Sequence, residues 1–405
     1  MKIIPCLFLV WISAVSAIGA ENPLPKGVPE ELTERVNHSL EYAFTQVKKT
    51  LAALPDTTLM PVSTKPDGSW TTAGIYDWRS GFFPGCLWMA YAYRPDDSLK
   101  AAAAGWTVKL EPIKDYSGNH DVGFMIFSSY GNGYRPTGDE KYREVILQAA
   151  RSLTKRYNPR VGLIQSWNAS GRWQYPVIID NMMNLELLFW AAKHGGGSDL
   201  SAIAETHALN TLKNHIRGDG STWHVVDYDP ATGNIRGKHT HQGYADSTAW
   251  SRGQAWGVYG FTMVYRETKN PLFLKAAQNL ADYYISHLPE DFIPFWDFQA
   301  PGIPNEPRDS SAAAIASSGL LELSVLAGDE KDRKRYRQAA LNMLSSLCSP
   351  KYMTEGSPGA AILRHATGSK PHGSDVDASL IYGDYYFLEA LLRYKGILKL
   401  GKPEY

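Results

Sequence analysis

The sequence predicts an all-α fold, an (α/α)6 barrel of six helical hairpins, and two observations favour it. Helix-type periodicity recurs along nearly the whole chain, whereas strand-type alternation is confined to residues 222–228 and a short stretch near Phe295. Every second expected helix follows a loop rich in Trp, His, Asp, Arg or Gly, and the others follow ordinary turns. In a closed ring of hairpins the inner helices begin at one end, so their entrance loops would meet at one pocket. The alternative is an irregular helical solenoid.

Apolar periodicity and the turns between helices define the elements in order. The first helix follows Pro29 and carries an apolar face that recurs every three or four residues. Turns such as Thr-Gly-Asp-Glu at 137–140 and Ala-Gly-Asp-Glu at 327–330 separate later helices. The expected helices span residues 30–54, 84–93, 98–114, 120–135, 139–157, 178–194, 199–215, 250–267, 271–288, 311–327, 330–347 and 378–396. The distinctive entrance loops lie near Trp78, Asp121, Asp180, Arg252, Asp309 and Asp377.

The composition narrows the class of protein. With 405 residues and 44% hydrophobic content, the chain can bury a large core. The formal net charge is zero, which argues against nucleic acid or a membrane surface as a partner. Aromatic residues make up 12% of the chain, and many lie beside polar residues. That pattern suits a groove that stacks sugar rings, with ordinary core packing as the alternative.

The first residues resemble an export signal. Lys2 supplies the positive start, residues 3–15 the apolar segment, and small residues follow. The apolar run is too short for a spanning helix, and no later segment looks transmembrane. We therefore expect a signal peptide over residues 1–20, a single barrel domain over 21–405, and export to the periplasm.

The sequence offers no metal or cofactor motif. After removal of the signal only Cys86 and Cys348 remain, both in apolar contexts typical of buried free thiols. His239 and His241 could be imagined as metal ligands, but no third ligand follows at a fixed spacing. A glycine-rich phosphate loop after a strand is also missing from the sequence, and so is a nucleophile elbow. We expect no cofactor and no metal.

Two carboxylates precede apolar helices. Asp180 stands in Ile-Asp-Asn-Met-Met-Asn, and Asp121 follows Asn119 and His120. Either aspartate could simply cap its helix. Because the same arrangement occurs twice in aromatic surroundings, the pair also suggests a site for general acid–base catalysis.

The densest cluster of polar and aromatic residues spans 222–261. It contains His224 and Gln242, followed by Arg252 and Trp256, which are four residues apart and share a helix face. A guanidinium beside an indole suits a planar anionic sugar, since the arginine pairs with a carboxylate and the ring stacks. A purely structural cation–π pair is the alternative.

Five motifs in order resemble the unsaturated glucuronyl hydrolases. They are Asn-His-Asp-Val-Gly-Phe at 119–124, Ile-Asp-Asn-Met-Met-Asn at 179–184, Trp-Ser-Arg-Gly-Gln-Ala-Trp at 250–256, Asp-Ser-Ser-Ala at 309–312 and Tyr-Gly-Asp-Tyr-Tyr at 382–386. That family folds as an (α/α)6 barrel. Its enzymes release the terminal 4,5-unsaturated uronic acid from oligosaccharides that polysaccharide lyases leave behind.

The resemblance implies a reaction by hydration of the C4=C5 enol ether rather than by direct displacement. It assigns the acid and base to Asp180, and to Asp121 a role in holding sugar hydroxyls and raising the pKa of Asp180. The matching positions imply further substrate-binding residues at Trp78, His120, His224, Gln242, Arg252 and Trp256.

A loop before the last inner helix suggests where a second sugar binds. It contains Ser369 and Lys370, whose hydroxyl and cation could meet a sulfate or carboxylate on that sugar. A solvated surface loop is the alternative.

Two other functions remain open from the sequence. Unsaturated rhamnogalacturonyl hydrolases are similar in fold and in hydration chemistry. The Asn-His-Asp motif that ends at Asp121 favours the unsaturated glucuronyl hydrolases over them. An exported glycan-binding protein without activity would use the aromatic residues equally, but it would not need an acid at Asp180.

Overall fold

The computed structural model describes residues 30–54 and 58–401. The signal peptide expected over residues 1–20 lies outside the described residues. Most of the described residues are in helices, as the sequence predicts, and short strands lie at one end of the helical assembly.

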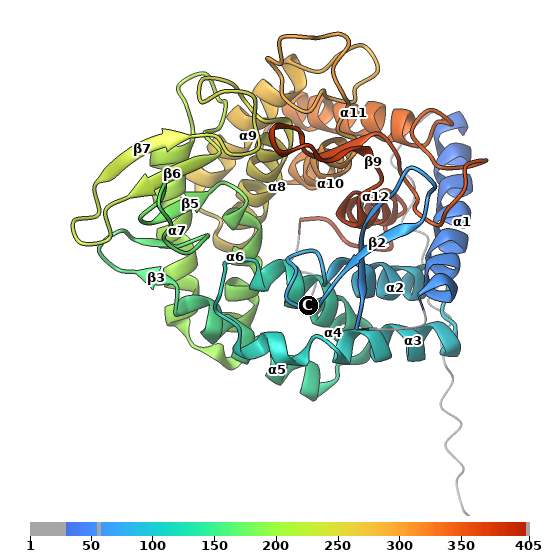
Figure 1. The fold of residues 1–405 in the computed structure, drawn as a ribbon, viewed down its shortest axis with the longest axis horizontal. Helices are drawn as coiled ribbons and strands as arrows, with labels where there is room; N and C mark the ends of the chain where they lie inside the picture. The colour runs from blue at the N-terminus through green and yellow to red at the C-terminus, as the bar shows by residue number, and fades with distance from the viewer. Residues whose placement is uncertain (1–29, 55–57, 402–405) are drawn as a thin grey trace, which may run out of the picture.

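Six helical segments form a closed inner ring (Figure 1). Each contacts the next, and the last contacts the first, so the barrel predicted from the alternating loops is confirmed. In chain order they are α2 (Phe82–Tyr93), the π-helix η2 (Gly123–Gly131) continued by α4 (Asn132–Thr137), α6 (Asn181–Ala191), α8 (Ser251–Thr268), α10 (Ser310–Leu326) and α12 (Ile381–Tyr394).

The other six helices surround this ring. They are α1 (Glu30–Ala53), α3 (Asp97–Val108), α5 (Glu140–Thr154), α7 (Ser198–His215), α9 (Pro271–Ser286) and α11 (Glu330–Leu347). Outer helices bury one face only, whereas α10 is buried on all sides over its first fifteen residues, from Ser310 to Ser324. Small residues allow this close approach. A Cβ on Gly319 of α10 would lie 2.9 Å from the Cα of Tyr259 in α8.

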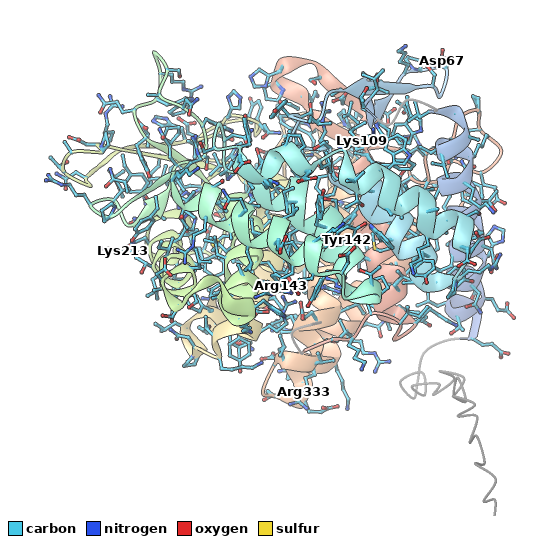
Figure 2. The ribbon with its side chains drawn as sticks, turned by 90° about the horizontal axis from the view of Figure 1, so that it is seen from below. Asp67, Lys109, Tyr142, Arg143, Lys213 and Arg333 are labelled. Carbon is cyan, nitrogen blue, oxygen red and sulfur yellow. The ribbon has the colours of Figure 1, made fainter. Side chains whose placement is uncertain are left out.

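The two ends of the barrel differ. Figure 2 shows Asp67 and Arg333 at opposite ends of the molecule, with Tyr142 and Arg143 of α5 on the wall between them. Short antiparallel sheets lie in the loops that lead into the inner helices. Their strands are β1 (Met60–Thr64) with β2 (Trp70–Ala73), β3 (Tyr157–Asn158) with β4 (Leu163–Ile164), β5 (Pro176–Ile178) with β6 (Val225–Tyr228) and β7 (Ile235–His239), and β8 (Ala366–Ser369) with β9 (Ser374–Ala378).

Several boundaries differ from the expected ones. Residue 178 was expected to start a helix, but Val177 and Ile178 pair with strand β6, and α6 begins only at Asn181. The helix expected over 98–114 ends at Val108 and is followed by the 3-10 helix η1 (Glu111–Asp115), since a proline near its start cannot continue the α-helical hydrogen bonds. The helix expected over 120–135 begins as the π-helix η2.

Most of the strands were not expected, because they are short and pair with distant segments. The stretch expected near Phe295 forms only isolated bridges, from Phe295 to Arg308 and from Asp297 to Trp250. Cys86 and Cys348 are buried free thiols, as predicted. None of the helices in the described part of the chain is both long and apolar enough to cross a membrane.

Candidate active site

Asp180 lies at the N-terminal end of α6, where an aspartate commonly caps a helix. Its side chain makes no capping hydrogen bond, and its Oδ2 atom accepts no hydrogen bond from a described residue. Asp309 shows the contrast, because its carboxylate accepts hydrogen bonds from the N–H groups of Ser311 and Ala312 at the start of α10. The capping interpretation is therefore wrong for Asp180, whose carboxyl group is left to face a cavity.

This cavity has a volume of about 90 Å³ and lies where the inner helices begin. Six of the predicted site residues line it: Trp78, His120, Asp121, Asp180, Gln242 and Arg252. Two more contact this lining from behind: the His224 ring faces Asp180, and the Trp256 ring lies 5.2 Å from that of Phe124. Residues from loops far apart in the sequence therefore meet at one point, as the alternating loop composition predicts.

Burial governs the protonation of Asp180, which is only 9% exposed. Removing a carboxylate from water disfavours its charged form, and this raises the pKa of Asp180 to about 7. Arg252, the backbone and Trp256 act in the opposite direction, because each favours the ionised form. A carboxyl group with this pKa can donate a proton near neutral pH and take one back afterwards.

His224 presents a hydrogen-bond donor to Asp180. Its Nδ1 atom accepts the backbone N–H groups of His241 and Gln242, each at 3.2 Å. A ring nitrogen that accepts these bonds carries no proton, so the proton of the neutral ring is on Nε2, 3.7 Å from Asp180 Oδ2. Burial lowers the pKa of His224 well below its usual value, and the neighbouring His241 and Arg252 lower it further. His224 is therefore a neutral neighbour of the acid.

Asp121 is the second buried carboxyl group. Burial raises the pKa of Asp121 well above its usual value, and the negative charges of Asp180 and Asp77 add to this effect. His120 Nε2 lies 3.3 Å from Asp121 Oδ1. Burial also lowers the pKa of His120 to about 3, so this imidazole is neutral at working pH. Asp121 therefore sits against a polar but uncharged ring.

Arg252 reaches the cavity from α8 and is held by three acceptors. Its Nη1 atom donates to Asp309 Oδ2 at 2.7 Å and to the carbonyl oxygen of Thr367, while Nη2 donates to the carbonyl oxygen of Gly368. The latter two carbonyls belong to strand β8. The guanidinium is therefore fixed between the start of α10 and the β8–β9 hairpin.

The alternative of a structural cation–π pair between Arg252 and Trp256 is wrong. The guanidinium lies over Trp250, 4.5 Å from the ring centroid, and 5.3 Å from that of Tyr382. Trp256 instead packs against Phe124 and lies close enough to Asp180 to influence its ionisation. Arg252 is instead held by hydrogen bonds to Asp309, which precedes α10, and to two carbonyl oxygens of β8. Its guanidinium therefore does not lie on the Trp256 ring.

Ser369 and Lys370 lie outside the cavity lining but next to it. Gln242 Nε2 donates to the carbonyl oxygen of Gly368 at 3.2 Å, which ties the lining to their loop. Ser369 Oγ lies 2.7 Å from His372 Nδ1, and the Lys370 ammonium is paired with the carboxylate of Glu306. The predicted cation is thus present at the rim, with its charge already offset.

Four apolar residues of the lining, three of them aromatic, were not among the predicted site residues. Phe124, Trp167, Ile178 and Trp250 also face the cavity. Trp167 is the most informative, because it comes from the loop between strands β4 and β5, which carried no expected site residue. In the sequence, the one sign that Trp167 could belong to a site is that this tryptophan stands among small and polar residues such as Ser166 and Asn168.

His239 and His241 do not share a ligand position. His239 Nδ1 lies 3.2 Å from Asp246 Oδ2, whereas the His241 ring packs against His372 with centroids 4.5 Å apart. In residues 30–54 and 58–401, no three or more His, Cys, Asp or Glu side chains group in a way that could hold a metal ion.

A helical barrel that brings two buried carboxyl groups and several indoles to one cavity defines an acid–base enzyme for sugar substrates. An unsaturated glucuronyl hydrolase from Formosa agariphila is 43% identical over 327 residues, or 80% of this chain and 81% of that protein. The chain therefore belongs to the unsaturated glucuronyl hydrolases, which are glycoside hydrolases. No protein-family model matches the chain.

Solved structures agree with this assignment. An unsaturated glucuronyl hydrolase specific for heparin is 41% identical, with a TM-score of 0.86 over 91% of this chain and 100% of that one. A variant of the Streptococcus agalactiae enzyme, complexed with dGlcA-GalNAc6S, is 30% identical, with a TM-score of 0.79 over 99% of this chain and 100% of that one. Neither a rhamnogalacturonyl hydrolase nor a non-catalytic glycan-binding protein is favoured by these comparisons.

Proposed function

We propose that Asp180 is the acid, and then the base, with which this hydrolase releases the terminal 4,5-unsaturated uronic acid from lyase-generated oligosaccharides. The observation that carries this assignment is the state of the Asp180 carboxyl group. Burial raises its pKa to about 7, and its Oδ2 atom is left without a hydrogen bond from a described residue. An acid of this kind is poised to transfer a proton to an atom that enters the cavity.

The reaction follows from the chemistry of an enol ether. Asp180 delivers its proton to C4, where the electrons of the double bond form the new C–H bond, and positive character develops at C5 and the ring oxygen. Water then forms a bond to C5 and gives a proton to the Asp180 carboxylate, which restores the acid. The resulting hemiketal opens, and the rest of the sugar leaves. The separation of the two carboxyl groups need not match a displacement mechanism, because no displacement occurs at C1.

The surrounding residues would bind and orient the unsaturated ring. Asp121, with the His120 ring beside it, would hold sugar hydroxyls by hydrogen bonds. Arg252 would attract the carboxylate of the uronic acid, and Trp78 would pack against the ring. Neutral His224, whose Nε2 atom lies 3.7 Å from Asp180 Oδ2, would place no positive charge beside the acid, so the carboxyl group can hold its proton.

The second sugar would lie against the β8–β9 hairpin. Ser369 and Lys370 follow directly after Gly368, whose carbonyl oxygen binds both Arg252 and Gln242. Relatives act on or bind different second sugars, since one neighbour is specific for heparin and another binds dGlcA-GalNAc6S. In this chain the pairing of Lys370 with Glu306 would weaken the attraction of a sulfate.

We further infer that the protein is exported to the periplasm. Lys2, the apolar residues 3–15 and the small residues after them support this inference. An unsaturated oligosaccharide produced outside the cytoplasm would then meet the enzyme there.

The direct test uses the absorbance of the substrate. The conjugated C4=C5 double bond absorbs ultraviolet light, and hydration removes it. Purified protein incubated with a lyase-generated unsaturated disaccharide should abolish this absorbance and release the second sugar. Persistent absorbance at high enzyme concentration, with disaccharides of several lyases, would contradict the proposal.

A further inference from the structure

Asp309 combines two roles at the start of α10. It is fully buried, and its Oδ1 atom accepts hydrogen bonds from the N–H groups of Ser311 at 3.1 Å and Ala312 at 3.3 Å. Its Oδ2 atom accepts a hydrogen bond from Arg252 Nη1 at 2.7 Å. One oxygen therefore caps the helix, while the other meets a guanidinium that lines the cavity.

Arg252 depends on this partner for its charge balance. Its side chain is buried, and its other two acceptors are the backbone carbonyls of Thr367 and Gly368, which carry no net charge. Among the described residues, Asp309 is the one carboxylate within ion-pair distance of Arg252. A buried cation without an anionic partner is costly, and its field acts strongly on neighbours in a medium of low dielectric constant.

The nearest consequence concerns Asp180, which lines the same cavity. Arg252 favours the ionised form of Asp180 and so opposes the proton that catalysis needs. The other polar groups around Asp180 are neutral His224, neutral His120, the second carboxyl group of Asp121 and the indole of Trp256. Arg252 is thus the cation that acts on Asp180, and it also contacts Tyr382 and Asp309.

We propose that Asp309 is a positioning residue for the reaction, which fixes Arg252 at the cavity and compensates its charge so that Asp180 keeps its proton. This inference rests on the proposed role of Asp180. It concerns a residue that touches no substrate and acts only through Arg252.

The substitution Asp309→Asn separates the two roles. Asparagine caps helices about as well as aspartate, so the amide oxygen can keep the bonds to Ser311 and Ala312. The amide nitrogen then faces Arg252, where a donor meets a donor and the negative charge is gone. The pKa of Asp180 should fall because the cation is no longer compensated.

The expected result is a shift of the alkaline side of the pH profile of kcat. Since Asp180 must be protonated, its half-activity point should move down by about 1 pH unit, the lower end of the range for an uncompensated nearby charge. At a fixed pH above that point kcat should drop about tenfold. KM should rise as well, because Arg252 is held by fewer contacts.

Asp384→Asn provides the matched control. Asp384 is also buried, and it accepts the N–H groups of Ile362 and Leu363, at 3.0 and 2.9 Å, in the segment that leads into β8. It supports the same hairpin without contacting Arg252. This variant should melt at a lower temperature but leave the alkaline half-activity point where it is.

A double variant guards against a folding defect. Arg252→Gln with Asp309→Asn removes both charges together, so its alkaline half-activity point should not lie below that of the wild type. An unshifted profile in folded Asp309→Asn, an equal shift in Asp384→Asn, or a downward shift in the double variant would overturn the inference. The proposed function fails by other results, namely full activity of Asp180→Asn or persistent substrate absorbance with the wild-type protein.

Discussion

The Nε2 atom of His224 lies 3.7 Å from Oδ2 of Asp180, and the ring presents a proton to the carboxyl group without carrying a charge. Two backbone N–H groups occupy Nδ1 and fix this tautomer. A protonated histidine at the same place would stabilise the carboxylate and lower the pKa of Asp180, so that Asp180 would be ionised near neutral pH and could not act as an acid. The backbone of residues 241 and 242 therefore helps to set the chemistry of Asp180.

The pH dependence of the wild-type enzyme follows from this arrangement. The pKa of Asp180 is raised to about 7, and the acid must carry its proton, so kcat/KM should fall as the pH rises through about 7. His120 and His224 have lowered pKa values and should add no ionisation of their own above pH 6. A pH profile of kcat/KM on an unsaturated disaccharide tests this. Activity that rises steadily between pH 6 and pH 8 would contradict it.

Selectivity for the second sugar should respond to the pair of Lys370 and Glu306. Glu306→Gln frees the ammonium, so the ratio of rates on sulfated and unsulfated disaccharides should rise by about two- to five-fold, as expected for a partly exposed charge. Lys370→Ala should lower the same ratio. If both variants keep the wild-type ratio, the second sugar does not meet this cation.

Metal removal should have no effect. The mechanism uses carboxyl groups, and the described residues offer no cluster of potential metal ligands. Activity measured before and after dialysis against a strong chelator should agree within error. Loss of activity that a divalent ion restores would instead direct attention to His239 and His241.

If the protein is exported, its mature form should lack the N-terminal signal peptide. If residues 1–20 form a signal peptide, protein isolated from its native source should begin near Ile18 or Glu21. Intact-mass measurement decides the matter, and a mass that includes Met1 would be incompatible with cleavage.

The sequence predicted the barrel and the carboxyl groups because both depend on local patterns. Alternating entrance loops reflect the position of each inner helix, and Asp121 and Asp180 each precede an apolar helical run. These features need no knowledge of distant contacts, so local patterns predicted the closed ring and the two carboxyl groups that line the cavity. Trp78, His120 and Gln242, which also line it, were assigned by the resemblance of the motifs to a known family.

The remaining features depend on contacts across long stretches of chain. Trp167 is placed in the cavity by its loop, where the carbonyl oxygen of Ser166 accepts the N–H group of His120 at 3.1 Å. Arg252 is oriented by Asp309, 57 residues further along, and by Thr367 of β8, 115 residues further along. Its helix neighbour Trp256 does not orient it. Periodicity within one helix carries no information about such partners.

The assignment of the acid is tested most directly by the turnover of Asp180→Asn on a lyase-generated disaccharide. Asparagine keeps the size of the side chain but cannot donate a proton to C4 or activate water. We expect kcat to fall by about 10²–10⁴-fold, the usual contribution of catalytic proton transfer, while KM stays close to that of the wild type. Asp121→Asn, as the matched comparison, should lose less of kcat and raise KM. Wild-type turnover by folded Asp180→Asn would contradict the account and make Asp121 the candidate acid.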